Sequence, residues 1–397
     1  MNNSLFKVAP LAIAAAVALA ACGKKEEAPA PKAEPAKAAA AAPAEVIKIG
    51  HVAPLTGGIA HLGKDNENGA RLAIEEINAA GGLKVGDKTY KLDIVAEDDK
   101  ADPKEGTIAA QKIVDSGAVA VVGHLNSGTS IPASKIYADA SVTQISPSAT
   151  NPKYTEQGFK TTFRVVANDN QQGGVLANYA ANQLKAKTIA IIDDRTAYGQ
   201  GLADVVEKVA KEKGLKVVAR EFTNDKATDF NAILTKIRGT KPDVVMYGGM
   251  DATAGPMAKQ MTQLGIKSTM LAGDGVCSPE FIKLAGDAAG ILHCSMAGEA
   301  VEKMAKGAEF VEKYKKRFNT DVQVYSPYSY DAVYVIADAI KRAGKADRAS
   351  ITGVMPATNY PGLTGTIAFD EKGDIKGGAI SMFKVVNGKM EYVSTVR

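Results

Sequence analysis

The feature that most constrains the fold is an alternation of short apolar, β-branched runs with longer amphipathic runs of helical period. Between residues 46 and 146 four strand-like runs are separated by three helix-like runs, and a second series of similar size follows between residues 188 and 272. Such alternation predicts two doubly wound α/β lobes, each with a mainly parallel sheet, and a cleft between them. Two further helices are expected at residues 307–318 and 329–343, and antiparallel strands at 365–369 and 379–393.

The stretch 118–140 is the first candidate for a binding function. It is predicted to form a buried strand at residues 118–122, a turn at 123–130 rich in Gly, Ser, Thr and Asn, and a helix that begins near Ile131 and Pro132. The first turn of a helix carries backbone N–H groups without partners and the positive end of the helix dipole. We therefore expect a small anion to bind at this turn.

Composition and motifs exclude several classes of protein. The chain has 397 residues, 46% of them apolar, and a formal net charge of +4 without a basic cluster, so nothing indicates a nucleic-acid partner. No G-x-G-x-x-G motif follows the first strand, and no G-x-S-x-G motif occurs. Gly123 and Gly128 have the spacing of a phosphate-binding loop, but Thr129 replaces its lysine. We expect neither a cofactor nor a metal.

Two catalytic interpretations are open from the sequence. His124 could act as a base for Ser127 in a hydrolase, although a packed or capping histidine is the simpler interpretation. Asp98 and Asp99 could form an acid–base pair, although a solvated turn beside a strand end is simpler. The histidines show no metal-ligand spacing; they are His51, His61, His124 and His293.

The N-terminal region is predicted to be a targeting segment followed by a tether. Residues 1–21 contain Lys7 and then a short Ala-rich apolar run that ends Leu-Ala-Ala before Cys22. This ending resembles the bacterial lipobox, which implies a lipoprotein signal peptide and lipidation of Cys22; the alternative is a plain secretory peptide. Residues 22–45 are dominated by Ala, Pro, Lys and Glu, so we expect a semi-extended tether there.

Two further cysteines, Cys277 and Cys294, lie near the ends of predicted strands. An exported protein meets an oxidising compartment, so the pair is expected to form a disulfide. Two buried free thiols are the alternative. Zinc is disfavoured because only His293 lies near these two thiols.

Polar turns in both predicted lobes suggest a site for a zwitterion. Ser127 and Thr150, with backbone N–H groups, could hold a carboxylate, and Asp274 could accept hydrogen bonds from an ammonium. Taken singly, Ser and Thr at such places are usually helix caps, and a loop Asp is usually solvated. The functional interpretation depends on the co-occurrence of these residues in turns of both lobes, at residues 123–130, 146–151 and 193–201 and at Asp274.

At the level of motifs the chain, from residue 47 to its end, resembles the leucine/isoleucine/valine-binding family, the type I periplasmic binding proteins of branched-chain amino-acid ABC transporters. The motifs are AIEEINAAGG (73–82), EDDKADP (97–103), VVGHLNSGTSIPAS (121–134), ISPSATNP (145–152), AYGQGLA (197–203), VVMYGG (244–249) and FDEKGDIKG (369–377). The resemblance implies three crossovers between the lobes. Lobe 1 is then expected at residues 46–167 plus 298–362, and lobe 2 at 168–297 plus 363–397.

The resemblance also implies which residues bind. The family's clamp for the head group of the amino acid falls on Ser127, Ser148, Ala149 and Thr150. Tyr198 matches a tyrosine that closes onto the ligand from lobe 2. Asp274 stands where the family has a Glu that takes the ammonium, so the ligand has to lie closer or to bind through a water.

Several positions depart from the family pattern. Leu62 and Met250 replace aromatic residues near the side-chain pocket, which stays apolar but changes shape. Tyr330 matches a family aromatic at the edge of the cleft. Ala101 and Asn126 replace the family's first-lobe cysteines, so a Cys277–Cys294 disulfide would be a separate one in lobe 2.

The family resemblance predicts a membrane-anchored lipoprotein on the periplasmic side of the cell envelope. It would bind a branched-chain or other apolar amino acid by hinge closure and deliver it to an ABC permease and its ATPase. The alternatives are a receptor for amides, urea or small aromatic acids, a ligand sensor of the same fold, and the Ser127–His124 hydrolase.

Overall fold

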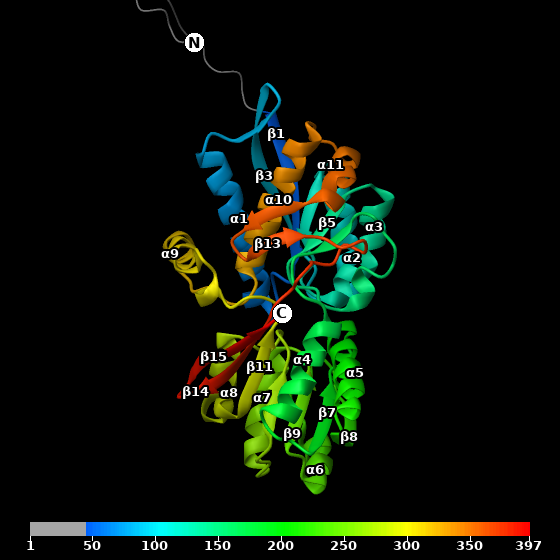
Figure 1. Ribbon diagram of the computed structural model, residues 1–397, viewed down its shortest axis with the longest axis vertical. Coiled ribbons are helices and arrows are strands. Elements are labelled where there is room, and N and C mark those ends of the chain that lie inside the picture. The colour runs from blue at the N-terminus through cyan, green and yellow to red at the C-terminus, as the bar shows by residue number, and fades with distance from the viewer. Residues whose placement is uncertain (1–44) are drawn as a thin grey trace, which may run out of the picture. The chain divides into compact units, whose positions relative to one another are not determined.

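The computed structural model describes residues 45–397 (Figure 1). The predicted signal peptide, Cys22 and the predicted tether up to residue 44 lie outside the described residues. Within residues 45–397, no helix is both long enough and apolar enough to cross a membrane.

The first sheet has six strands in the order β2-β3-β1-β4-β5-β6. Neighbouring strands pair in parallel, except that β2 and β3 form an antiparallel hairpin. Ile47 and Ile49 pack on one face with helices α1 and α10, and Val121 packs on the other with α2 and α3. Apolar side chains thus point to both faces of the strands, and a near-continuous apolar run therefore predicts a sheet that helices cover on both faces. The bounds are β1 Glu45–Ala53, β2 Leu83–Val85, β3 Lys88–Asp98, β4 Ala120–Gly123, β5 Thr143–Ser146, β6 Thr162–Arg164, α1 Ala60–Ala79, α2 Pro103–Asp115, α3 Ser127–Asp139 and α10 Ser326–Ala343.

The second sheet has seven strands in the order β15-β14-β11-β10-β9-β7-β8. Strands β7, β8, β9, β10 and β11 pair in parallel with one another, whereas β14 and β15 add an antiparallel hairpin next to β11. Ile191 packs with helices α4 and α5, and Ile192 packs on the opposite face with α6 and α7. The bounds are β7 Thr188–Asp193, β8 Lys216–Phe222, β9 Val244–Gly248, β10 Thr269–Ala272, β11 Leu292–Met296, β14 Ile380–Val386, β15 Lys389–Val396, α4 Asp169–Asn182, α5 Ala197–Glu212, α6 Asn231–Thr240, α7 Asp251–Gln263 and α8 Pro279–Ala285.

The chain passes three times between the region of the first sheet and that of the second. It leaves the first after β6, returns after β11, and leaves again after the β12–β13 hairpin to form β14 (Figure 1). The prediction of two α/β lobes joined by three segments is confirmed. The expected boundary between lobe 1 and lobe 2, between residues 362 and 363, falls within the β12–β13 hairpin. The remaining elements are α9 Gly307–Phe318, α11 Arg348–Val354, β12 Asn359–Gly362, β13 Gly365–Ala368 and the 3-10 turns Pro152–Tyr154, Gly286–Ile291, Val301–Lys303 and Met355–Ala357.

Several helices differ from the sequence-based expectation. Helix α3 begins at Ser127 rather than near Ile131, and α10 begins at Ser326 rather than at residue 329. Helix α4 was not expected at all, because its sequence is polar and contains two adjacent glycines. It begins at Asp169 and is capped by Asn168, whose side chain accepts from the N–H groups of Asn170 and Gln171.

Candidate functional site

Among the described residues, the start of helix α3 has no side-chain cap. Its N-cap residue, Asn126, makes no side-chain cap, whereas Asp102, Asn168 and Thr196 cap helices α2, α4 and α5. The buried hydroxyl of Ser127, the first residue of α3, accepts from the N–H of Asn151 at 3.2 Å. The uncapped first turn fits the anion site expected from the sequence.

Arg164 anchors the loop after β5 through hydrogen bonds to its backbone. This fully buried guanidinium donates to the carbonyl oxygens of Ala149 and Asn151 at 2.8 and 3.0 Å. The N–H of Ala149 donates to Ser146 Oγ at 2.9 Å, so both backbone groups of Ala149 are already in use. Thr150 lies between the two anchored carbonyls, and its buried hydroxyl has no hydrogen-bond partner among residues 45–397.

Ser148 is also tied into lobe 1. Its hydroxyl donates to the carbonyl of Leu125 at 3.1 Å and accepts from Asn66 at 3.3 Å. Of the four residues expected to clamp the head group, Thr150 has a hydroxyl without a partner among residues 45–397, and Ser127 has a hydroxyl that accepts from Asn151. Ser148 and Ala149 hold the loop that carries Thr150.

Asp274 follows strand β10 and is almost fully buried. Its carboxylate accepts from Gln172 Nε2 and the hydroxyl of Tyr198, both at 2.9 Å, and from the hydroxyl of Tyr325 at 2.8 Å. Burial raises the pKa of Asp274, and these three donors offset part of that effect. The structure thus brings Tyr198 and Asp274 together, as the family resemblance implies.

A second buried carboxylate, Asp169, was missed from the sequence. Its Oδ1 accepts from Gln172 at 3.0 Å, while its buried Oδ2 has no partner among the described residues. Burial, and then the nearby charge of Asp274, raises the pKa of Asp169 to about 7. The hydroxyl of Thr150 lies near Asp169 without completing a well-formed hydrogen bond. A cation placed here would satisfy both carboxylates and relieve their mutual repulsion.

An apolar group adjoins these polar residues. Leu62 and Met250 belong to one buried cluster with Leu125, Tyr198 and Tyr325. Leu62, Leu125 and Tyr325 come from lobe 1, whereas Tyr198 and Met250 come from lobe 2. Side chains of both lobes could therefore enclose an apolar ligand group beside the polar one.

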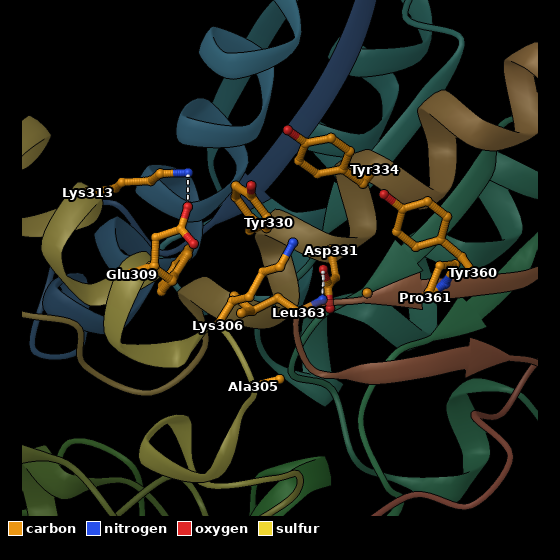
Figure 2. Close-up of a pocket in the computed structure, with 12 residues that line it drawn as sticks. Ala305, Lys306, Glu309, Lys313, Tyr330, Asp331, Tyr334, Tyr360, Pro361 and Leu363 are labelled. Atoms are coloured by element: carbon orange, nitrogen blue, oxygen red, sulfur yellow. Dashed lines mark hydrogen bonds and ion pairs between the residues drawn. The ribbon is translucent and has the colours of Figure 1, made fainter.

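Tyr330 lies elsewhere. It lines a cavity between α9, α10 and β12, whose residues are drawn in Figure 2. The volume of this cavity is about 550 Å³. The hydroxyl of Tyr330 donates to Glu76, and the same cavity carries charges of both signs, including the ion pair of Lys313 with Glu309. The aromatic residue that reaches Asp274 is Tyr325, the N-cap of α10. Tyr325 directly precedes Ser326 and Pro327. A proline in the first turn is a signal of a helix start, and it could have placed the start of α10 at residue 326.

The histidine proposed for the hydrolase interpretation has other partners. His124 Nδ1 lies 2.9 Å from Asp99, and Nε2 lies 3.0 Å from the hydroxyl of Tyr137. Both ring nitrogens are thus engaged away from Ser127. Asp99 is fully buried, so the expectation of a solvated turn is wrong for this residue; Asp98 instead accepts from backbone and hydroxyl donors of Leu55 and Thr56.

Cys277 and Cys294 form a disulfide, with Cα atoms 5.5 Å apart. Cys277 lies in the loop that carries Asp274, and Cys294 lies in the neighbouring strand β11. The bond therefore ties the Asp274 loop to the second sheet. Within residues 45–397, no group of three or more His, Cys, Asp or Glu side chains is placed to hold a metal ion.

The chain is similar to known proteins over most of its length. The chain matches the periplasmic binding protein family over residues 46–389. It is 38% identical to the Leu/Ile/Val-binding protein homolog 1 of Brucella abortus, over 87% of this chain and 93% of the relative. It is 35% identical to the leucine-, isoleucine-, valine-, threonine-, and alanine-binding protein of Pseudomonas aeruginosa, over 86% and 90%.

A solved structure extends the comparison. The branched-chain amino acid transporter substrate-binding protein LivJ of Streptococcus pneumoniae, in complex with isoleucine, has a TM-score of 0.80 at 29% identity. The match covers 89% of this chain and 99% of the other. These relatives are solute-binding proteins, so the prediction of a binding protein rather than an enzyme is confirmed.

Proposed function

This chain belongs to the periplasmic binding protein family, and on that premise we propose that it binds an aliphatic α-amino acid between its two lobes. The carboxylate of the ligand binds at the uncapped start of α3, with the hydroxyls of Ser127 and Thr150. The ammonium binds beside Asp274 and Asp169. Charge-assisted hydrogen bonds at both ends of the head group would fix its orientation.

One observation carries the proposal. Two buried carboxylates, Asp169 and Asp274, lie near the hydroxyl of Thr150, and among residues 45–397 this hydroxyl and one oxygen of Asp169 have no hydrogen-bond partner. Unsatisfied buried polar groups are costly, so they are retained where a ligand satisfies them. An amide or an aromatic acid has no ammonium for these carboxylates.

The side chain of the ligand packs on Leu62 and Met250, with Leu125, Tyr198 and Tyr325 around them. Each buried methylene contributes about 0.8 kcal/mol, so discrimination among Leu, Ile and Val should be modest. The name of the Pseudomonas aeruginosa relative, which includes threonine and alanine, agrees with such a breadth of ligands.

A ligand screen tests this function. Thermal unfolding of the protein with Leu, Ile, Val and Ala is compared with unfolding in acetamide, urea and benzoate. At a concentration of 1,000 times Kd a ligand stabilises the native state by about 4 kcal/mol, which is a rise of several degrees in Tm. A rise only with amides or aromatic acids would reject the amino-acid proposal.

We further propose that the protein is anchored through lipidated Cys22 and delivers its ligand to an ABC permease and its ATPase. Incorporation of labelled fatty acid into the wild type but not into Cys22→Ser tests the anchor. Neighbouring permease and ATPase genes, and loss of amino-acid uptake on deletion, would support import. Unchanged uptake would favour a sensor.

A further inference from the structure

A hydrogen bond between the lobes lies beside the apolar part of the proposed site. His61, in the first turn of α1, belongs to lobe 1, and Asp251, the first residue of α7, belongs to lobe 2. His61 Nε2 lies 2.7 Å from Asp251 Oδ2. The side chain of His61 is 22% exposed and that of Asp251 is fully buried.

The bond is coupled to closure by its position. His61 adjoins Leu62 and Asp251 adjoins Met250, the two residues proposed to contact the ligand side chain from opposite lobes. Hinge opening would separate these lobes and break the bond, leaving His61 in water. The pair therefore forms only when the two lobes close on one another.

The closed arrangement surrounds His61 with negative charge. Burial opposes protonation, but the hydrogen bond and charge of Asp251, with Glu280 of α8 and Asp65 of α1, raise the pKa of His61 above its ordinary value. Asp251 also accepts from the hydroxyl of Ser278, and its buried Oδ1 has no partner among the described residues. A protonated His61 is therefore the form that suits the closed lobes.

We propose that His61 is a positioning residue for lobe closure: its protonated ring binds Asp251 across the cleft, so closure takes up a proton and acidic conditions tighten ligand binding. This inference rests on the proposed amino-acid binding. When the lobes open, the ring returns to solvent and to its ordinary titration. Affinity is then highest below the pKa of the open form and falls as the pH rises through the pKa of the closed form.

Asp169 should change the pH dependence of ligand binding in the opposite direction. Its raised pKa means that an ammonium ligand would displace a proton from it near neutral pH, which favours binding as the pH rises. The effect of His61 is therefore the difference in pH dependence of affinity between the wild type and a His61 variant, because Asp169 is present in both.

Isothermal titration with leucine or isoleucine tests the inference, at pH values from about 5.5 to 8.5 and in buffers of different ionisation enthalpy to count protons. Relative to His61→Gln, the wild type should lose affinity several-fold as the pH rises and should take up additional protons on binding. Asp251→Asn should behave as His61→Gln does. His61→Lys, which carries a fixed charge, should keep its affinity at the alkaline end.

The matched control is His293→Gln. His293 is partly buried on β11 against Tyr179, apart from the proposed site, and this variant should keep the wild-type pH profile. Parallel profiles and equal proton uptake in the wild type and His61→Gln would overturn the role of His61 while leaving amino-acid binding intact. Absence of binding at every pH would overturn the proposed function and this inference together.

Discussion

Two buried carboxylates near Tyr325 have contrasting surroundings. Asp65 accepts from the N–H groups of Gln323, Val324, Tyr325 and Ser326 and from the hydroxyl of Tyr314. Asp169 has one oxygen on Gln172 and the other without a partner among residues 45–397. A carboxylate saturated by protein donors holds a structural element, here the start of α10. An unsaturated one beside a second carboxylate is available to a ligand.

Removing the saturated carboxylate should have the largest effect on stability. Asp65→Ala leaves four backbone N–H groups and a hydroxyl without their acceptor, so the free energy of unfolding should fall by about 4 to 5 kcal/mol. Urea denaturation of the ligand-free protein measures it. Asp338→Ala, which removes only a partly exposed i,i+4 ion pair with Arg342, is the control and should change stability by less than about 1 kcal/mol. Equal effects of the two variants would contradict the comparison.

Asp169 should make stability depend on pH. Burial and Asp274 raise its folded pKa from 3.8 to about 7, so the folded state retains a proton that the unfolded state has lost. This stabilisation is complete below the unfolded pKa and disappears as the pH rises through 7. It amounts to at most about 4 kcal/mol.

The measurement compares urea denaturation of the wild type and Asp169→Asn between about pH 4 and pH 8. His51 acts in the opposite direction, because burial lowers its pKa to about 4 and acid therefore destabilises the fold. Its contribution is present in both proteins and cancels in the difference. A difference that does not vary with pH would mean that Asp169 is ionised throughout.

Asp274 should matter for binding more than for folding. Asp274→Asn should weaken affinity for aliphatic amino acids by more than about 2 kcal/mol, or roughly 30-fold, because the ammonium loses a charged partner. The ligand-free stability should not fall, since the variant removes a buried charge next to Asp169. Isothermal titration gives the affinity, with Asp287→Asn on the surface of the same lobe as the control. Wild-type affinity in Asp274→Asn would remove this residue from the site.

The smallest expected effect on affinity is that of Tyr325, just before α10, and it can be compared with that of Tyr330 within α10. Tyr325→Phe removes one of three donors to Asp274 and keeps the ring in the apolar cluster, so affinity should fall by about 1 kcal/mol. Tyr330→Phe should leave affinity unchanged, because its hydroxyl contacts Glu76. If Tyr330→Phe weakened binding as much as Tyr325→Phe, the placement of the site would be wrong.

The sequence indicated much of the proposed site because its signals are local. Ser127 and Tyr198 lie in the first turn of a helix that follows a strand, and Thr150 and Asp274 lie in loops after strands. The carboxyl ends of parallel strands lie at one edge of a sheet. Asp169 was missed because helix α4 has little apolar periodicity. Tyr330 was assigned from the family resemblance, whereas the structure places the hydroxyl of Tyr325 on Asp274 and that of Tyr330 on Glu76.

By itself, the sequence determined the alternation of strands and helices, the two parallel sheets and the polar turns at their carboxyl ends, because these follow from periodicity within short segments. The tertiary structure alone decided which polar groups are saturated. Asp65 is satisfied by residues 249 to 261 positions away, and Asp274 meets Gln172 and Tyr325 from distant segments. Such pairings depend on how distant segments pack within and between the lobes, and no local pattern encodes them. The same packing joins His61 to Asp251 across the cleft.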